Sequence, residues 1–471
     1  MFRFPGVQSS ERQTVVTERK HPAMSDSHSV MHFPLLAPKA VQVDFTGGSL
    51  SSEGGLVLLA QLDQQLGLTQ RVAACLSDPR LPERIRHSLL DLIRQRVYQI
   101  ASGYEDANDA TSLRADPALK VAVGRCPHSD PDLASQPTLS RLESTVTEAE
   151  CDQINALLLD QFLQTPRTKP NEIVLDFDPS VDPTHGQQEF AFFNGHYGTY
   201  CYLPLFVFAR ASGEGEQFLV SAQLPESHGK EIDAVLATLQ RLVAGLRKQW
   251  PSVRVIFRGD AWFATPALYE WCEANTVPYA IALAGNPALH TLSQRWREQA
   301  AAAAANAPTG SARRFGAFEY RAGEWTKHRQ VVVKAEQTAL GPNPRYVVVW
   351  GLKGKPRQLY QFYAGRGACE NRIKELKEGV KSDRTSCCEF ASNKVRLMLS
   401  SVAYVLLQQL RRVARQTGLS RAQVEGLRLA VIKIAARVTE RVRRVVIELC
   451  SSCPSQAVWR VLARRLGIVT G

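Results

Sequence analysis

Three acidic residues, far apart in the chain, stand at places where strands and a helix can present them to one site. Asp178 closes the apolar run IVLDF, and Asp260 closes the run VRVIFRG. Glu370 lies in YAGRGACENRIKELK, which has helical spacing. Carboxylates are hard ligands for divalent cations, and two such ions about 4 Å apart serve the attacking and leaving oxygens of phosphodiester chemistry. These acids therefore predict a site for two Mg²⁺ or Mn²⁺ ions.

Each acid also has an ordinary structural explanation. Asp176 points to the same face of its strand as Asp178, so either could be the first ligand. Asp178 is preferred because it ends the strand, before Pro179. Taken alone, an aspartate after a strand is a common turn residue, and the helix of Glu370 could be a solvated face with i,i+4 ion pairs. The prediction of a metal site therefore depends on the three acidic side chains lying close together in the folded chain.

The segments between 170 and 285 predict how the two aspartates meet. Short β-branched and aromatic runs at 173–178, 200–210 and 218–224 are followed by a helix at 230–249, a strand at 253–260, a helix at 265–275 and a strand at 278–285. Three strands, helix, strand, helix, strand is the order of a ribonuclease-H-like core. The first and fourth strands of such a sheet are neighbours, so Asp178 and Asp260 would lie at one edge.

The rest of the chain is predicted to surround this α/β core. The predicted order is a flexible arm (1–40), a mainly helical DNA-binding domain (41–169), the first part of the core (170–285), a β-rich insertion (286–358), the helix that carries Glu370 and completes the core (359–389) and a C-terminal helical region (390–471). Two helices, at about 390–416 and 421–449, are expected in the last region. VQVDFTGGSLSSEGG, at 41–55, predicts a small hairpin.

The charge balance favours a polyanionic partner. Lys and Arg number 57 against 45 Asp and Glu, a net charge of +12 with a pI near 9.3. A solvated basic surface is the alternative interpretation. Two clusters could neutralise phosphates: Arg84, Arg86, Arg94 and Arg96, and then Arg437, Arg441, Arg443, Arg444, Arg460, Arg464 and Arg465.

Other partners and compartments are disfavoured by the sequence. No uninterrupted apolar run of about 18 residues is present, which predicts no membrane span. The first residues lack the apolar region of a secretion signal, which predicts a cytoplasmic protein. Cys450 and Cys453 form the only CxxC pair, without a second pair at zinc-ligand spacing.

One motif carries a family resemblance. Tyr363, two residues, Arg366, three residues, Glu370, six residues and Lys377 match the Y-(2)-R-(3)-E-(6)-K signature. The chain thereby resembles bacterial insertion-sequence DDE transposases. Further segments similar to one branch of that clan are FTGGSLSSEGG, GYEDANDATSLRADPALK, DPTHGQQ, HYGTYCYLPLFVF, RGDAWF and DRTSC, so the resemblance extends from about residue 40 to near the end.

The resemblance implies roles for individual residues. Asp178, Asp260 and Glu370 would be the metal triad, and Tyr363, Arg366 and Lys377 would contact the DNA backbone near the cut. Lys374 shares the helix face of Glu370 and adds a second phosphate-binding lysine. Relatives usually have Thr and Ser where this chain has Ser180 and Ala261.

One further residue, Trp325 in the insertion, resembles an aromatic that holds a flipped base; a buried core tryptophan is the alternative.

The function expected from these features is cut-and-paste DNA transposition. Double-stranded DNA, as transposon terminal inverted repeats and as target, would be the partner of a homodimer in the bacterial cytoplasm, associated with the nucleoid. Two alternatives stay open. A ribonuclease-H-like nuclease would cut without joining, and a catalytically decayed relative would only bind DNA.

Overall fold

The computed structural model describes residues 30–33, 35, 39, 41–166, 168–226 and 231–468. The chain divides into two compact units, Met1–Gly48 and Ser49–Gly471. In the first unit, β1 (Met31–Phe33) pairs antiparallel with β2 (Val41–Val43). Most of the predicted flexible arm, residues 1–29, lies outside the described residues. No helix in the described ranges is both long and apolar enough to cross a membrane.

Helices dominate the second unit up to residue 163, as the sequence predicts. Two of them begin with capping boxes, Ser88 with Asp91 and Thr147 with Glu150, which satisfy backbone N–H groups at the helix start. These elements are β3 (Leu50–Ser51), α1 (Leu56–Leu66), α2 (Leu68–Ala74), α3 (Leu89–Ala101), α4 (Ala110–Leu113), α5 (Pro117–Val123), α6 (Gln136–Thr145) and α7 (Glu148–Leu163), with 3₁₀ turns at Pro82–Arg84 and Ala107–Asp109.

A nine-stranded sheet follows, in the order β12-β13-β15-β11-β10-β4-β8-β9, with β14 paired to β13. β4, β8 and β9 form an antiparallel meander, and β10 lies parallel to both β4 and β11. The strands of the first part are β4 (Glu172–Pro179), β8 (Leu205–Ala211), β9 (Phe218–Gln223), β10 (Arg254–Gly259) and β11 (Tyr279–Leu283). With α8 (Glu231–Gln249) before β10 and α9 (Pro266–Ala274) after it, these elements have the predicted order. The single strand predicted at 200–210 is, however, two: residues 199–202 belong to a separate small sheet, and only β8 belongs to this one.

The segment predicted as a β-rich insertion extends this same sheet beyond β11. It begins with two helices, α10 (Pro287–Leu292) and α11 (Gln294–Ala305). The run of alanines at 300–305 forms the last turns of α11. Its strands are β12 (Ala312–Tyr320), β13 (Arg329–Thr338), β14 (Gly341–Pro342) and β15 (Arg345–Trp350). A separate small sheet comprises β5 (Asp182–Pro183), β6 (Phe192–Asn194) and β7 (Thr199–Tyr202).

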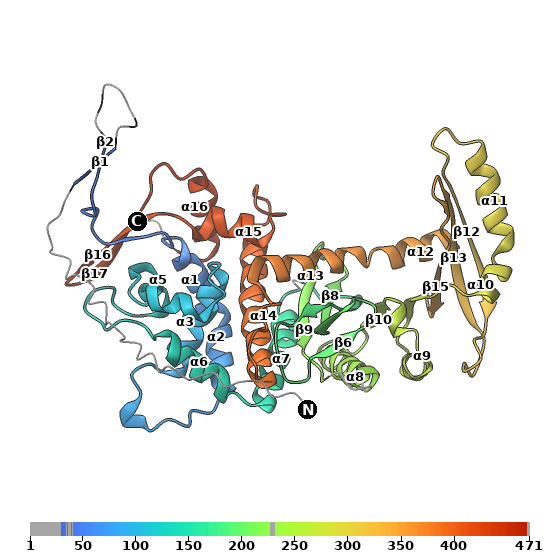
Figure 1. The fold of residues 1–471 in the computed structure, drawn as a ribbon, viewed down its shortest axis with the longest axis horizontal. Coiled ribbons are helices and arrows are strands. Elements are labelled where there is room, and N and C mark those ends of the chain that lie inside the picture. The colour runs from blue at the N-terminus through green and yellow to red at the C-terminus, as the bar shows by residue number, and fades with distance from the viewer. Residues whose placement is uncertain are drawn as a thin grey trace, which may run out of the picture. The chain divides into compact units, whose positions relative to one another are not determined.

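Helices cover both faces of the large sheet (Figure 1). One face carries Ile173, Leu175 and Phe177 and packs against α8, α9 and α11. On the other face, β8 and β9 pack against α13 (Gly367–Val380) and α14 (Phe390–Val413), while β11, β13 and β15 pack against α12 (Pro356–Ala364). Asp176 and Asp178 alternate with the first set, so they face α12 and α13.

Two helix predictions near the C-terminus need correction. The single helix expected to carry Glu370, within 359–389, is two helices, α12 and α13, separated at Gly365 and Arg366. The helix expected at 421–449 is a short α15 (Val424–Leu427), a π turn at Arg428–Ile432 and a hairpin of β16 (Ala436–Arg441) and β17 (Arg444–Leu449). The C-terminal region is therefore not all helical, although α16 (Gln456–Arg465) follows.

The hairpin predicted at 41–55 is also wrong. β2 pairs with β1, whereas β3 pairs with β16. Gly54 and Gly55 donate backbone hydrogen bonds to the carbonyl oxygens of Ile434 and Ile432. A side chain at Gly55 would place its Cβ 1.7 Å from the carbonyl oxygen of Val431. The glycines thus permit a close backbone contact with the distant segment 431–434 rather than a local turn.

Candidate active site

The pairing of β4 with β10 brings the two aspartates level with each other. The strands are parallel, and Asp176 lies opposite Arg258. Two residues further along the chain, Asp178 lies near the end of β4 on the same face as Asp176, and Asp260 follows directly after the end of β10. The backbone N–H of Trp262 donates to the Asp260 carboxylate at 2.9 Å, which fixes Asp260 at the start of a 3₁₀ turn, Ala261–Phe263.

Glu370 approaches this edge from the first turn of α13. Arg366, the residue before α13, holds it there: its Nη2 lies 2.5 Å from Glu370 Oε1 and its Nη1 lies 3.1 Å from Asp178 Oδ1. Asp178 is 8% exposed, whereas the Glu370 side chain is 56% exposed. One guanidinium therefore bridges two of the three predicted ligands, one from the sheet and one from the helix.

The three acids and Arg366 are electrostatically coupled. Burial raises the pKa of Asp178 to about 7; the Arg366 charge opposes that rise, and the charges of Asp260 and Glu370 add to it. Burial also raises the pKa of Asp260, opposed by the Trp262 hydrogen bond and by Arg366, with Glu370 adding to the rise. The pKa of Arg366 is raised by all three acids, despite its burial. The described geometry thus concentrates negative charge around a single cation.

The donor chemistry of this cluster fits a divalent cation, although the side chains are not arranged as metal ligands. Among the residues that the structure describes, no three His, Cys, Asp or Glu side chains lie close enough together to hold a metal ion. The Arg366 guanidinium lies between Asp178 and Glu370. Carboxylates that share a partly buried positive charge are the donor set that a hard cation would need. A metal ion bound by these two carboxylates would take the place of the Arg366 guanidinium.

Asp176, the alternative first ligand, is fully engaged elsewhere. Its Oδ1 accepts from Arg258 Nε at 2.6 Å, and its Oδ2 accepts from Arg258 Nη2 at 2.7 Å and from Gln217 Nε2 at 2.5 Å. Asp176 and Arg258 are both 0% exposed. This bidentate pair leaves Asp178 as the carboxylate of β4 that faces Arg366.

The buried pair also explains a glycine at the break between α12 and α13. Arg258 Nη1 donates to the carbonyl oxygen of Phe362, at the end of α12, at 2.5 Å. A Cβ on Gly365 would lie 2.7 Å from that same Nη1. Gly365 therefore lets the helix junction pass over the guanidinium. Sequence reasoning missed Arg258, although an arginine within an apolar strand signals a buried partner.

The other predicted residues of the helix have distinct surroundings. Lys377 donates from Nζ to the Val181 carbonyl oxygen at 2.6 Å and lies 3.3 Å from Ser180 Oγ, so it ties α13 to the turn after Asp178. Lys374 is exposed and pairs with Glu378 at 3.7 Å. Burial raises the pKa of the Tyr363 hydroxyl, and the neighbouring Arg366 opposes that rise.

One further aromatic, Tyr197, was not predicted. Burial and the charges of Asp260 and Asp178 raise the pKa of its hydroxyl, which places it within electrostatic reach of both acids.

Trp325 is not placed to stack on a base. It is 5% exposed and packs edge-on against Tyr269 and Tyr320, with ring centroids 5.2 and 5.5 Å away. The Arg329 guanidinium lies 5.3 Å from its ring centroid. A ring buried in this way stabilises the contact between α9 and the inserted strands, so the core alternative is the one that the packing supports.

The arginines predicted to bind phosphates differ in their exposure and in their partners. Arg96 is wrong as a phosphate contact, because it is 3% exposed and pairs with Glu143 at 2.8 Å. Arg94 is half-buried, and its Nη1 donates to the Val123 carbonyl oxygen. Arg84 and Arg86 are exposed. In the second cluster, Arg437, Arg441, Arg443 and Arg444 lie exposed on the β16–β17 hairpin.

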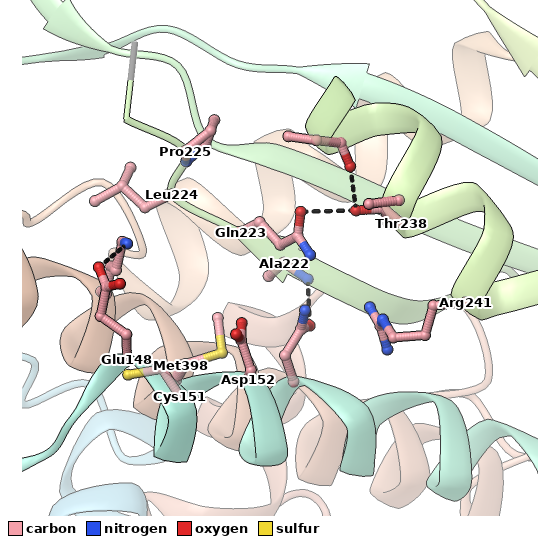
Figure 2. A pocket seen from close by; sticks show the side chains of 14 residues that line it. Glu148, Cys151, Asp152, Ala222, Gln223, Leu224, Pro225, Thr238, Arg241 and Met398 are labelled. Atoms are coloured by element: carbon pink, nitrogen blue, oxygen red, sulfur yellow. Dashed lines mark hydrogen bonds and ion pairs between the residues drawn. The ribbon is translucent and has the colours of Figure 1, made fainter. Parts of the chain in front are cut away.

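A cavity of about 380 Å³ lies away from these residues, between α7, the end of β9 and α8 (Figure 2). Glu148, Asp152, Gln223 and Arg241 are among its lining side chains, and Glu148 forms an ion pair with Lys394. None of the predicted site residues lines it. The chemistry suggested by the sequence is therefore at the sheet edge, not in this cavity.

Two aspartates at the ends of adjacent parallel strands, faced by a helix that presents a glutamate, define a protein with an acidic triad on an α/β scaffold. The family described as Transposase DDE domain group 1 matches residues 33–469. The chain belongs to this family and is a DDE transposase, an enzyme type that acts on DNA. No curated protein matches the chain.

Proposed function

We propose that this transposase cuts DNA at transposon ends and joins the released ends to target DNA, with Asp178, Asp260 and Glu370 as its catalytic acids. The observation that carries the proposal is that Arg366 pairs with both Asp178 and Glu370, while Asp260 follows the strand β10 that lies beside the strand of Asp178. These acids lie up to 192 positions apart in the sequence and come from a strand, a turn and a helix.

The sheet supports a ribonuclease-H-like core. Its strands run in the order β9-β8-β4-β10-β11, with β8 antiparallel to its neighbours and β10 parallel to both of its own. α8 leads from β9 to β10, and α9 leads from β10 to β11. This is the arrangement that places Asp178 and Asp260 together, and the strands of residues 312–350 extend it without separating them.

In the proposed mechanism, Asp178, Asp260 and Glu370 would hold two Mg²⁺ or Mn²⁺ ions. Such ions, when bound, activate an attacking oxygen and stabilise a leaving oxygen on phosphorus. Burial of Asp178 keeps water from screening its charge. Arg366 neutralises the acids until it is displaced, and its guanidinium is then free to pair with a DNA phosphate. Lys377, anchored to the turn after Asp178, keeps α13 in register with β4.

Joining needs two transposon ends held at once, so we propose that a homodimer acts on a pair of terminal inverted repeats and a target duplex. Lys374 and Tyr363 would contact the DNA backbone beside Arg366. The exposure of Lys374 supports this role, because the side chain is reachable by a phosphate.

The decisive experiment supplies the purified chain with Mg²⁺ and a plasmid that carries the DNA flanking its gene. Excision and joined products are expected from the wild type, and neither from Asp260→Ala. Binding of the variant to the same DNA should persist, because Asp260 supports catalysis rather than docking.

Two other outcomes separate the alternatives. Cleavage without any joined product would identify a nuclease and contradict strand transfer. DNA binding with no metal-dependent cleavage from the wild type would identify a decayed enzyme.

A further inference from the structure

A cavity of about 890 Å³ in the helical region has an unusually basic lining. It lies between the loop 77–87, the start of α3, the loop 131–135 and α6. Five arginines and a histidine line it: Arg80, Arg84, Arg86, Arg114, Arg141 and His87. Only Asp78 and Asp132 supply negative charge to the same lining.

Two of these five arginines pair with acidic side chains, and among the described residues the other three do not. Arg80 is held by Asp78 at 2.6 Å and by the His87 carbonyl oxygen at 3.0 Å. Arg114 lies 3.5 Å from Asp132, with both side chains nearly half exposed, so this pair is weak. Arg84, Arg86 and Arg141 are exposed and make no ion pair with any side chain that the structure describes.

Two neighbouring features point the same way. Burial lowers the pKa of His87, and the positive charges of Arg125, Arg80 and Arg86 lower it further. Asp91 opposes this effect. A lowered histidine pKa is expected where positive charge predominates. Ser135 and Thr138, at the start of the ten-residue helix α6, also line the cavity, and Ser135 makes no side-chain cap. The amino end of α6 contributes the positive end of the helix dipole, although Pro137 has no backbone N–H and that of Thr138 already donates to the Ser135 carbonyl oxygen.

We propose that this arginine groove binds the phosphodiester backbone of transposon-end DNA, as a docking site distinct from the acidic triad. The assignment rests on the proposed function in one respect, that the chain handles such DNA. Of the three guanidinium groups without an ion pair in the described part of the chain, that of Arg141 donates from Nε to the Pro137 carbonyl oxygen at 3.0 Å. These three, with a fourth in a weak pair, match several consecutive phosphates better than a single small anion. Contacts of this kind position a duplex without reading its sequence.

The test compares two triple variants with the same change in charge. Arg84→Gln/Arg86→Gln/Arg141→Gln alters the groove, and Arg437→Gln/Arg441→Gln/Arg443→Gln alters the exposed β16–β17 hairpin. Binding of a fluorescent duplex carrying the gene's flanking DNA is measured by anisotropy in EDTA, from low to high salt. Thermal unfolding checks that each variant is folded, which is expected because these side chains are exposed.

The groove variant should lose at least about tenfold in affinity, with the slope of log Kd against log salt reduced by about 2 to 3, since each phosphate contact contributes about 0.9. The hairpin variant should stay closer to the wild type. The proposal would be overturned if the folded groove variant kept the affinity and the salt slope of the wild type. It would also be overturned if the hairpin variant lost as much affinity as the groove variant. Because binding is read without metal, the result is independent of whether the wild type cuts and joins DNA.

Discussion

Arg366 is the residue on which the electrostatics of the site depend. It pairs with Asp178 and Glu370, and its charge also reaches Asp260. In effect, the guanidinium occupies the position of a cation among carboxylates. A side chain in that position competes with any divalent ion for the same oxygens, yet it is also well suited to a DNA phosphate once displaced. Metal binding and catalysis should therefore respond in opposite directions when it is removed.

Arg366→Gln should bind Mn²⁺ more tightly, by on the order of tenfold or about 1.4 kcal/mol, because the competing charge is gone. DNA cleavage should fall, because a phosphate contact is lost. Mn²⁺ titration followed by electron paramagnetic resonance measures the first effect. Lys374→Gln, on the same helix but paired only with Glu378, is the control and should leave Mn²⁺ affinity unchanged. Unchanged or weaker Mn²⁺ binding by Arg366→Gln would contradict the competition.

Gly365 and Gly367 allow a second comparison within one segment. Gly365→Ala should destabilise the protein by about 1 to 3 kcal/mol and reduce cleavage, because its Cβ would lie 2.7 Å from Arg258 Nη1 and shift the helix that carries Glu370. Gly367→Ala has nothing within 4 Å of the new Cβ and should be neutral or slightly stabilising. Urea denaturation and cleavage rates distinguish them. Equal effects of the two substitutions would exclude a close contact at Gly365.

At the scale of elements, Arg258 joins two strands and a helix. It pairs with Asp176 across β4 and β10 and bonds to the last turn of α12 through the Phe362 carbonyl oxygen. Removing one member of a fully buried pair leaves the other charge without a partner in a low-dielectric interior. The position of α13 over the sheet should depend on this pair.

Asp176→Asn should lower the free energy of unfolding by about 3 to 5 kcal/mol, whereas Asp176→Leu/Arg258→Met should recover part of that loss, because no charge stays buried. The matched control lies on the same two strands: Glu172 and Arg254 are paired at 3.1 Å but are 35% and 44% exposed. Glu172→Gln should cost less than about 1 kcal/mol in the same urea titration. A similar cost for Asp176→Asn and Glu172→Gln would rule out a stabilising role for the buried pair.

The sequence predicted the strands and helices around the acids well, because β4 and β10 are nearly continuous apolar runs that end in an acid. It did not predict the Asp176–Arg258 pair, since strand register is a tertiary property. It also misread 436–449 as helix. In each strand of the β16–β17 hairpin a charged residue stands next to an apolar one, Arg437 beside Val438 and Glu448 beside Ile447. This alternation is typical of a strand, but the spacing of the neighbouring apolar residues fits a helix equally well. The partner strand β3, almost 390 positions away, decides the structure.

At the scale of the whole second unit, the core is continuous across the predicted boundary at 169. One cluster of buried side chains includes Leu59 of α1, Leu158 of α7, Phe208 of β8, Cys369 of α13 and Leu406 of α14. α14 contributes the largest run of these residues and contacts both the early helices and the sheet. A change in charge at the site should therefore alter the stability of the unit as a whole.

The pH dependence of stability gives the last test. Burial raises the pKa of Asp178 and of Asp182 to about 7 in the folded chain, from 3.8. Between about pH 4 and pH 7, the folded state keeps protons that the unfolded state has lost, so raising the pH removes stability, up to about 4 kcal/mol for each group. Burial favours a higher pKa for Glu150, but hydrogen bonds from Thr147 and Ser77 lower it from 4.5 to about 2. The stability that Glu150 contributes is therefore lost as the pH falls from 4.5 to about 2. For these three groups, the metal-free protein should thus be most stable at about pH 3.5 to 4.

Mg²⁺ should restore stability increasingly as the pH rises toward 7, because a bound cation favours the ionised form of Asp178. Thermal unfolding across pH, with Mg²⁺ and with EDTA, measures this difference. Asp178→Asn should abolish the Mg²⁺ effect and raise the metal-free Tm near pH 7. Asp182 accepts from Thr385 at 2.6 Å and is not among the proposed ligands, so Asp182→Asn should raise the metal-free Tm yet keep the Mg²⁺ effect. If Asp178→Asn retained full stabilisation by Mg²⁺, Asp178 would not be a metal ligand.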